Sequence, residues 1–301
     1  STPVINMLVG FFMGLSAGAG VVISQYFGGR RKEDMSKAVH SSIALTALLS
    51  VVFTVAGMLF TKPLLRAIGV PEEVLPHSSL YLTIYFAGMT FSLFYNMGSG
   101  ILRAVGDSRH PLIYLAVASL VNIALDFLFV CGFHMGIAGV AIATIIAQAV
   151  SSAMVMYKLM HTQEDYKLEL RKIHFHKKMV KKIIAFGFPA ALQQSITSFS
   201  NVIVQSYINR FGATAMAGYS AAIRIDGFLQ LPLQSFNMAI TTFVGQNIGA
   251  KQYRRVKKGI WAAWVMSSLV ILVGSVGMYF FAPYLIGVFT DDVQVIANGS
   301  G

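Results

Sequence analysis

One carboxylate stands inside a long apolar stretch of the sequence. Residues 111–132 contain Asp126 as their single charged residue, and Asn122 precedes it by four positions. At that spacing in an α-helix, both side chains lie on the same face. A carboxylate at the centre of a membrane helix costs about 2.5–3.5 kcal/mol on insertion scales, so it usually pairs with a cation, a proton or a polar group. We therefore predict a cation or proton site here; the alternative is an Asp near a helix end that reaches the lipid headgroups.

A third oxygen-bearing side chain lies in the next apolar segment. Residues 111–132 and 137–158 are separated by a short turn, which predicts an antiparallel helical hairpin. Such a hairpin can bring the hydroxyl of Thr144 beside Asn122 and Asp126. Carboxylate, amide and hydroxyl oxygens together suit Na⁺ as the bound metal ion, and the same carboxylate could instead carry H⁺. The alternative for Thr144 is a hydrogen bond to its own helix backbone.

A second group of polar residues follows the helix expected at 180–209. Its members recur at three- and four-residue spacing, so they form one polar face. They are Gln194, Ser198, Asn201 and Gln205. This face predicts the wall of a hydrated substrate cavity, and hydrogen bonding between packed helices is an equal alternative. Asp226 is a further cavity candidate, although its neighbour Arg224 favours an interfacial ion pair.

The composition places these residues in a membrane. Of 301 residues, 55% are hydrophobic and 12% are charged, about half the charge of an ordinary soluble domain. Eight apolar segments have the length of about 20 residues that a membrane helix needs. They lie near 4–27, 40–61, 79–102, 111–132, 137–158, 180–209, 217–245 and 259–283. We predict an all-α polytopic membrane protein in contact with membrane lipid.

The basic residues are distributed in a way that predicts the orientation of the chain. The net charge is +11, and 19 of the 23 Lys and Arg residues fall in alternate loops between the apolar segments. By the positive-inside rule, these loops face the cytoplasm. We therefore expect a multi-pass protein of a plasma (inner) membrane, and no nucleic-acid partner. One cysteine excludes an internal disulfide, and the seven histidines lack the spacing of metal ligands.

A short motif occurs twice in the chain. Gln25-x-x-Gly28 and Gln246-x-x-Gly249 each close a long apolar segment and precede a basic turn, 221 residues apart. Six segments lie between them, so both copies enter the membrane in the same direction, as in parallel-repeat transporters. With six helices per half, the first half would lack its first helix and the second its last three. We expect an internal fragment with an N-terminal lobe at 1–160, a cytoplasmic linker at 161–179 and a C-terminal lobe at 180–301.

Several motifs, in order along the chain, resemble those of the multidrug and toxic compound extrusion (MATE) transporters. They are Arg103-Ala104-x-Gly106-Asp107-x-Arg109-x-Pro111, Asn122-x-x-Leu125-Asp126, Gly139-x-Ala141-x-Ala143-Thr144 and the paired Gln-x-x-Gly endings. The resemblance implies two six-helix lobes around a central cavity, with eight of twelve helices present here. It implies antiport of cationic or amphipathic organic compounds against Na⁺ or H⁺, without a cofactor and without enzymatic activity.

The resemblance also implies roles for individual residues. Asn122, Asp126 and Thr144 match the cation or proton site of the first lobe, which in the family often includes an aspartate from the first helix. Gln193 and Gln194 stand where some members carry acidic residues, which favours the prokaryotic damage-inducible-like branch. We expect a monomer. The alternatives are a lipid-linked oligosaccharide flippase of the same superfamily, which predicts a more cationic cavity, and an intramembrane enzyme, which needs clustered carboxylates.

Overall fold

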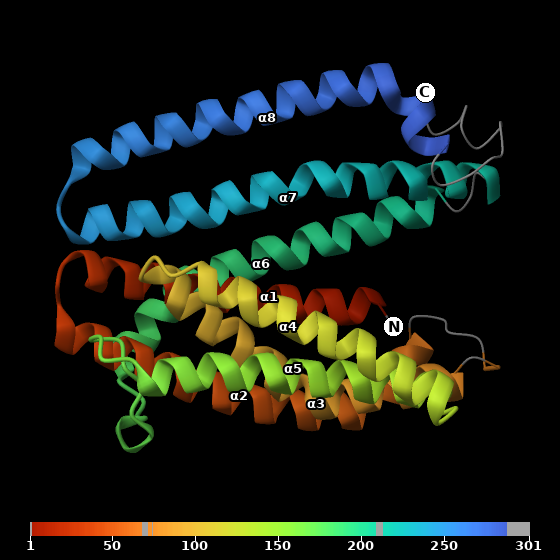
Figure 1. The fold of residues 1–301 in the computed structure, drawn as a ribbon, viewed down its shortest axis with the longest axis horizontal. Helices are drawn as coiled ribbons and strands as arrows, with labels where there is room; N and C mark the ends of the chain where they lie inside the picture. Colours follow the sequence, from red (N-terminus) through yellow and green to blue (C-terminus); the bar gives the residue numbers. More distant parts are fainter. Residues whose placement is uncertain (1, 68–71, 74, 209–212, 288–301) are drawn as a thin grey trace. The chain divides into compact units, whose positions relative to one another are not determined.

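The computed structural model describes residues 2–67, 72–73, 75–208 and 213–287 (Figure 1). These residues form eight α-helices and no β-strand, which confirms the all-α class and all eight predicted segments. The helices are α1 (Thr2–Gly28), α2 (Lys32–Ala67), α3 (Leu75–Ala104), α4 (Arg109–Asp126), α5 (Gly136–His161), α6 (Lys177–Ile208), α7 (Ala213–Gly249) and α8 (Tyr253–Gly287). A π-helix, η1 (Phe127–Gly132), continues α4, and a short 3₁₀ turn, η2 (Leu170–Lys172), precedes α6.

Length and composition alone qualify five described segments to cross a membrane. They lie at Gly10–Gly28, Lys32–Pro63, Arg109–Gly132, Gly136–His161 and Tyr253–Phe280. The helices α3, α6 and α7 fall outside this set. The first holds serines and Asn96 among its apolar residues, and the other two carry the polar residues noted above. A bundle helix that buries polar groups against its neighbours can still span, since only its lipid-facing surface must be apolar.

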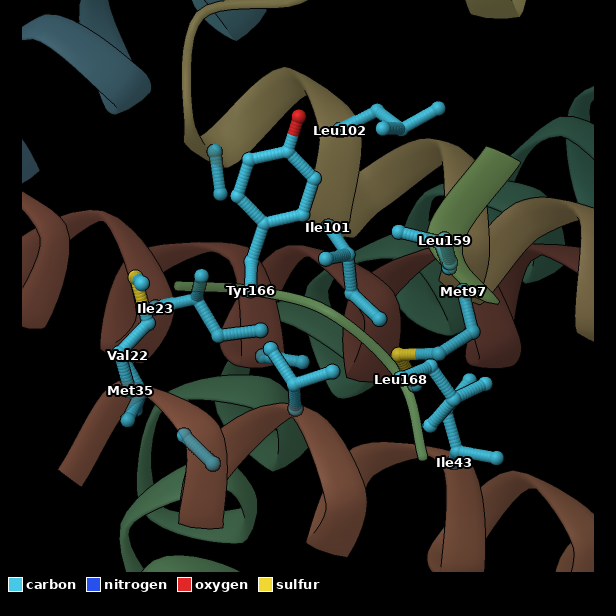
Figure 2. Close-up of a cluster of buried hydrophobic side chains, with 14 of the residues drawn as sticks. Val22, Ile23, Met35, Ile43, Met97, Ile101, Leu102, Leu159, Tyr166 and Leu168 are labelled. Carbon is cyan, nitrogen blue, oxygen red and sulfur yellow. The ribbon is translucent and has the colours of Figure 1, made fainter. Parts of the chain in front are cut away.

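The chain divides into two compact units, Ser1–Ser195 and Ile196–Gly301. The larger of two buried clusters in the core of the first unit consists of mostly aliphatic side chains from α1, α2, α3, α5 and α6, with Tyr114 from α4. Tyr166 and Leu168, which belong to the segment between α5 and α6, pack into the same cluster (Figure 2). The segment after α5 is therefore part of this core. In the second unit, the close approaches of Gly259 to Phe243 and of Gly274 to Leu229 show that α7 and α8 pack antiparallel.

Two glycines allow α1 and the first part of α6 to touch backbone to backbone inside the first unit. A Cβ atom on Gly18 would lie 2.3 Å from the backbone nitrogen of Gly187, and one on Gly14 would lie 2.4 Å from the Cα of Ala191. Contacts this short are possible only without a side chain. Close approach of this kind stabilises helix pairs in lipid, where apolar side chains gain little by leaving the solvent.

The two copies of the repeated motif end their helices with the same turn. After α1, the N–H of Arg31 donates to the carbonyl of Tyr26 and the N–H of Arg30 donates to that of Phe27. After α7, the same two bonds occur 221 residues later, because Gln252 donates to Asn247 and Lys251 to Ile248. This is the Schellman pattern, and its left-handed residue is basic in both copies, with φ of 51° at Arg30 and 58° at Lys251. The two copies of the motif therefore share one backbone conformation, while the larger repeat of two helical halves stays a prediction.

Candidate functional site

The carboxylate of Asp126 lies at the junction between α4 and η1. Asp126 is the last residue of α4 and Asn122 lies one turn earlier, and both residues are half-buried. Two of their polar atoms are fully buried, Oδ1 of Asp126 and Nδ2 of Asn122, and neither has a hydrogen-bond partner among the described residues. A buried polar atom without a partner is uncommon in a folded protein, because its lost hydration is not replaced. These two atoms therefore mark a place where a ligand can supply the missing interactions.

The backbone changes its geometry directly after Asp126. Residues Phe127–Gly132 form the π-helix η1, and the N–H of Phe133 donates to the carbonyl of Leu128 over 3.0 Å. Short π-helical segments within α-helices occur frequently at functional sites, because the wider turn displaces side chains from the regular helical path. The sequence does not indicate this π-helix. The six residues are apolar except for Gly132, and such a composition carries no signal that separates π from α geometry.

The α4–α5 hairpin determines which residues of α4 lie at the same level along the helix axes as Thr144. A Cβ atom on Gly139 would lie 3.0 Å from the Cβ of Phe129, so these two positions face each other near the turn. Thr144 lies five residues beyond Gly139, and the position five residues before Phe129 falls between Asn122 and Asp126. The Thr144 hydroxyl, however, donates to the carbonyl of Val140 over 2.9 Å. The hydroxyl hydrogen of Thr144 is therefore bonded to its own helix, as the alternative prediction had it. The lone pairs of the hydroxyl oxygen remain available to a ligand.

The turn before α4 holds the helix that carries Asp126. Gly106 has a φ of 96°, and the Asp107 carboxylate accepts hydrogen bonds from the backbone N–H of His110 over 3.2 Å and from its Nδ1 over 2.6 Å. The hydroxyl of Tyr95 donates to the carbonyl of Pro111 over 3.0 Å, which joins α3 to the start of α4. The Asp107 carboxylate thus binds the first turn of α4, and these contacts fix the start of that helix.

The predicted cavity residues are divided between the two units. Gln194 belongs to the first unit, where its side chain covers the backbone of α1, since a Cβ atom on Gly10 would lie 2.7 Å from its Cγ. Ser198 is half-buried and Asn201 is exposed, both in the second unit. Asp226 is exposed and accepts a hydrogen bond from Gln230 over 2.8 Å. Gln205 lies in α6, with its side chain outside the described set.

Comparison with known proteins places these features in a family. A family model named MatE matches residues 1–128 and 189–301. The chain is 29% identical over 305 residues to "Probable multidrug resistance protein YoeA" of Bacillus subtilis (strain 168), with 98% of this chain and 65% of that protein covered. It is 30% identical to "Probable multidrug resistance protein YpnP" of the same organism, with 99% and 67% covered. The chain thus spans about two thirds of the length of these relatives.

A solved structure gives the same picture for the fold. The chain resembles the outward-facing conformation of a multidrug resistance MATE family transporter of the MOP superfamily, with a TM-score of 0.91 and 26% sequence identity. The alignment covers 99% of this chain and 67% of that one. The likeness therefore extends over all the helices described above, including the α4–α5 hairpin.

Proposed function

This chain belongs to the MatE family of membrane transporters, and from that membership we propose that the protein is a secondary active exporter of cationic or amphipathic organic compounds. Export would be coupled to the entry of Na⁺ or H⁺, which binds at Asp126. Transporters of this family need no cofactor and are not enzymes, so the coupling ion is a cargo rather than a resident group. Two lobes, at 1–160 and 180–301, would alternate around the cavity.

The observation that carries this proposal is the pair of unpartnered buried atoms on one helix face. Oδ1 of Asp126 lacks a donor and Nδ2 of Asn122 lacks an acceptor among the described residues. A bound H⁺ gives the carboxyl group a hydroxyl that can donate, and a bound Na⁺ gives Oδ1 a direct electrostatic partner. Rotating the Asn122 amide by half a turn exchanges Nδ2 for Oδ1, so the same position can supply a second oxygen to a metal ion.

Loading of Asp126 would control the conformational equilibrium of the transporter. An ionised carboxylate with a buried oxygen disfavours any conformation that keeps it dehydrated, and a bound cation or proton removes this penalty. The ion then shifts the population only as far as it binds one conformation more tightly than the other. The π-helix that begins at Phe127 would give the helix a place to change its hydrogen bonding as the site fills and empties.

The substrate class follows from the neutral polar face of α6. Gln194, Ser198 and Asn201 offer hydrogen bonds without positive charge, which suits organic cations and amphipathic compounds. A flippase for lipid-linked oligosaccharides would have to bind diphosphate groups, for which Lys or Arg at membrane depth is the usual partner. The basic residues of this chain lie mostly in loops, and this distribution favours the exporter.

The same distribution supports an orientation. The basic turns after α1, α3, α5 and α7 would lie on the cytoplasmic side of a prokaryotic plasma membrane, by the positive-inside rule. The protein would act as a monomer, with small organic molecules and the coupling ion as its ligands.

The proposal is tested by dye efflux from vesicles that contain the protein, driven separately by a Na⁺ gradient and a pH gradient. We expect one gradient to drive ethidium efflux and the Asp126→Asn variant to lose it. Asp165→Asn is the matched control, since it makes the same chemical change at an exposed carboxylate that pairs with Lys32 over 3.2 Å. Normal coupled efflux by the Asp126 variant would refute the mechanism. If folded protein moves no dye under either gradient, transport of lipid-linked sugars becomes the next test.

A further inference from the structure

The turn between α7 and α8 lies within the second unit (Figure 1). A basic hollow is formed at this turn. Its volume is about 530 Å³. It is lined by Lys251, Gln252, Tyr253, Arg254, Arg255 and Lys258. Four of these six residues are cations, and a fifth, Lys257, belongs to the same turn of helix.

Among the described residues of the second unit, no anionic side chain pairs with this group. The sequence contains no Asp or Glu between Asp226 and Asp291, and the ion pairs among the described residues involve none of the five cations. Mutual repulsion of clustered cations is unfavourable unless counterions or an anionic ligand compensate it. The hollow is therefore a concentrated positive surface that pairs with no acidic side chain in the part of the second unit that the structure describes.

The equivalent turn in the first copy of the repeat is neutralised by the chain itself. An offset of 221 residues places Glu33 and Asp34 at the positions of Arg254 and Arg255, on the same backbone pattern. There, Arg31 pairs with Asp34 over 2.5 Å, and Lys37 pairs with Glu33. The two turns thus share their hydrogen bonds and differ by an inversion of charge at two positions. This difference has no explanation in the backbone, which is alike in both.

The N-terminus of α8 adds positive charge to the hollow, and its first turn contains no acidic residue to balance this charge. A helix N-terminus carries partial positive charge, and acidic side chains in the first turn are favourable there, as Glu33 and Asp34 are in α2. The first turn of α8 contains no acidic residue and holds Arg254 and Arg255 instead. None of the backbone hydrogen bonds at this turn uses the N–H of Tyr253 or Arg254. An anion seated here would accept from these N–H groups and compensate both the dipole and the arginines.

Aromatic residues on α8 place the hollow at the boundary between lipid and water. Trp261 and Trp264 are the two tryptophans of the chain, and they are 68% and 66% exposed in the described structure. Tryptophan is enriched at the level of the lipid headgroups. Trp261 lies eight residues from Tyr253, about 12 Å along the helix axis. From this preference we expect the hollow to lie beside the headgroup layer.

From this position and charge, we propose that the hollow binds the phosphate headgroup of an anionic phospholipid of the leaflet that the α7–α8 turn faces. The arginine and lysine side chains pair with the phosphate, the N-terminus of α8 donates to it, and the acyl chains run along the apolar surface beside Trp261 and Trp264. The leaflet is the cytoplasmic one if the orientation proposed above is correct, but binding itself does not depend on ion coupling or export.

The test uses the two tryptophans as reporters of their lipid neighbours. The full protein is reconstituted in phosphatidylcholine vesicles that contain a small fraction of either brominated phosphatidylglycerol or brominated phosphatidylcholine, since bromine quenches nearby tryptophan. The fluorescence of the Trp261→Phe/Trp264→Phe variant is subtracted from that of the parent, and the difference is the signal from these two tryptophans. We expect several-fold more quenching by the anionic lipid than by the neutral one at equal bulk fraction.

A pair of variants locates the effect. Arg254→Gln/Arg255→Gln should abolish most of this several-fold preference for the anionic lipid, because each basic residue at a membrane surface contributes about 1 kcal/mol, or about fivefold. The control Arg31→Gln/Lys32→Gln removes the same charge from the first copy of the turn and should leave the preference unchanged. Equal quenching by the two lipids, or an equal loss in both variants, would overturn the proposal. Inorganic phosphate that abolishes the preference at millimolar concentration would also overturn it in favour of a soluble anion.

Quenching by the brominated neutral lipid reports whether each variant is inserted. A variant that retains this quenching is in the bilayer, so its loss of anionic preference is then a loss of binding. Because no gradient and no substrate are present, failure of the exporter proposal would leave this result unaffected.

Discussion

The imidazole of His40 accepts a hydrogen bond at Nε2 from the backbone N–H of Glu169, over 3.1 Å, and so joins α2 to the segment before α6. His40 is 1% exposed, and its Nδ1 lies 2.7 Å from the carbonyl of Ser36. With Nδ1–H donating to that carbonyl, Nε2 is free to accept, which fixes the neutral tautomer. The neighbouring Ser41 hydroxyl donates to His174 and accepts from the N–H of His176, so α2 holds the segment at two points.

Replacement of His40 should therefore release the segment between α5 and α6. The variant His40→Ala leaves the Glu169 N–H without its acceptor and opens a cavity in a packed region. The expected destabilisation is about 1–3 kcal/mol. Thermal unfolding in detergent measures the loss, and limited trypsin digestion should cleave faster at the lysines and arginines around η2. His161→Ala is the control, because His161 is exposed and bonds only within its own helix. Equal trypsin sensitivity of the two variants would contradict this role.

Two glycines on α1 should respond to alanine with opposite signs. At Gly18, a Cβ atom would meet the backbone of Gly187 at 2.3 Å, whereas at Gly20 the nearest atom is 3.7 Å away, at normal contact distance. Alanine improves helix propensity by up to about 1 kcal/mol at either position. Gly20→Ala should therefore stabilise slightly, and Gly18→Ala should destabilise by about 1–3 kcal/mol, because α1 and α6 must move apart. The unfolding temperatures of the two variants test this prediction. A higher unfolding temperature for both variants would contradict it, because it would show that α1 and α6 separate easily.

Glycine in place of the two basic residues with positive φ that end α1 and α7 should raise the stability of the protein. Arg30 and Lys251 occupy left-handed backbone, which is unfavourable by about 1–2 kcal/mol for residues with a Cβ atom. Arg30→Gly and Lys251→Gly should each raise stability by about 0.5–1 kcal/mol, in the same direction at both copies of the turn. Gln252→Gly is the control, since φ is not positive there, and it should lower stability through the entropy of the unfolded chain. Equal effects at Lys251 and Gln252 would contradict the prediction.

Acid should loosen the ion pair that follows the His40 contact. The Lys172 ammonium donates to the Glu169 carboxylate over 2.8 Å and holds the pKa of that exposed carboxyl below its usual value. A lowered pKa in the folded state means that the contribution to stability is present above the unfolded pKa and is lost as the pH falls through the folded one. Glu169→Gln should show less change in stability than the parent below about pH 4.5. Parallel pH profiles would show that the pair contributes nothing.

The helices could be predicted from the sequence because apolar length and loop charge are local properties. The repeat around Arg30 and Lys251 was also visible, since a Schellman turn leaves a short motif. The π-helix after Asp126 could not be predicted, because the residues that form it suit either helix type. Nor could the contact of His40 with Glu169, since a hydrogen bond between residues 129 positions apart depends on tertiary packing. The same limit applies to Thr144, whose back-bond to Val140 the sequence offered only as an alternative.

The role of Thr144 in the proposed site can be separated from its role in the fold. The hydroxyl of Thr144 donates its hydrogen to the carbonyl of Val140. A back-bond of this kind adds little to helix stability. The free energy of unfolding of Thr144→Val should therefore lie within about 0.5 kcal/mol of that of the parent. If the hydroxyl oxygen is a third ligand beside Asp126 and Asn122, Thr144→Val should weaken binding of the coupling cation about tenfold, while Thr144→Ser should retain it. Binding is measured as the rise in unfolding temperature with Na⁺ concentration, in the Asp126→Asn background and without it. Undiminished Na⁺ binding by the valine variant would reduce the site to two residues, because the oxygen is then absent without consequence.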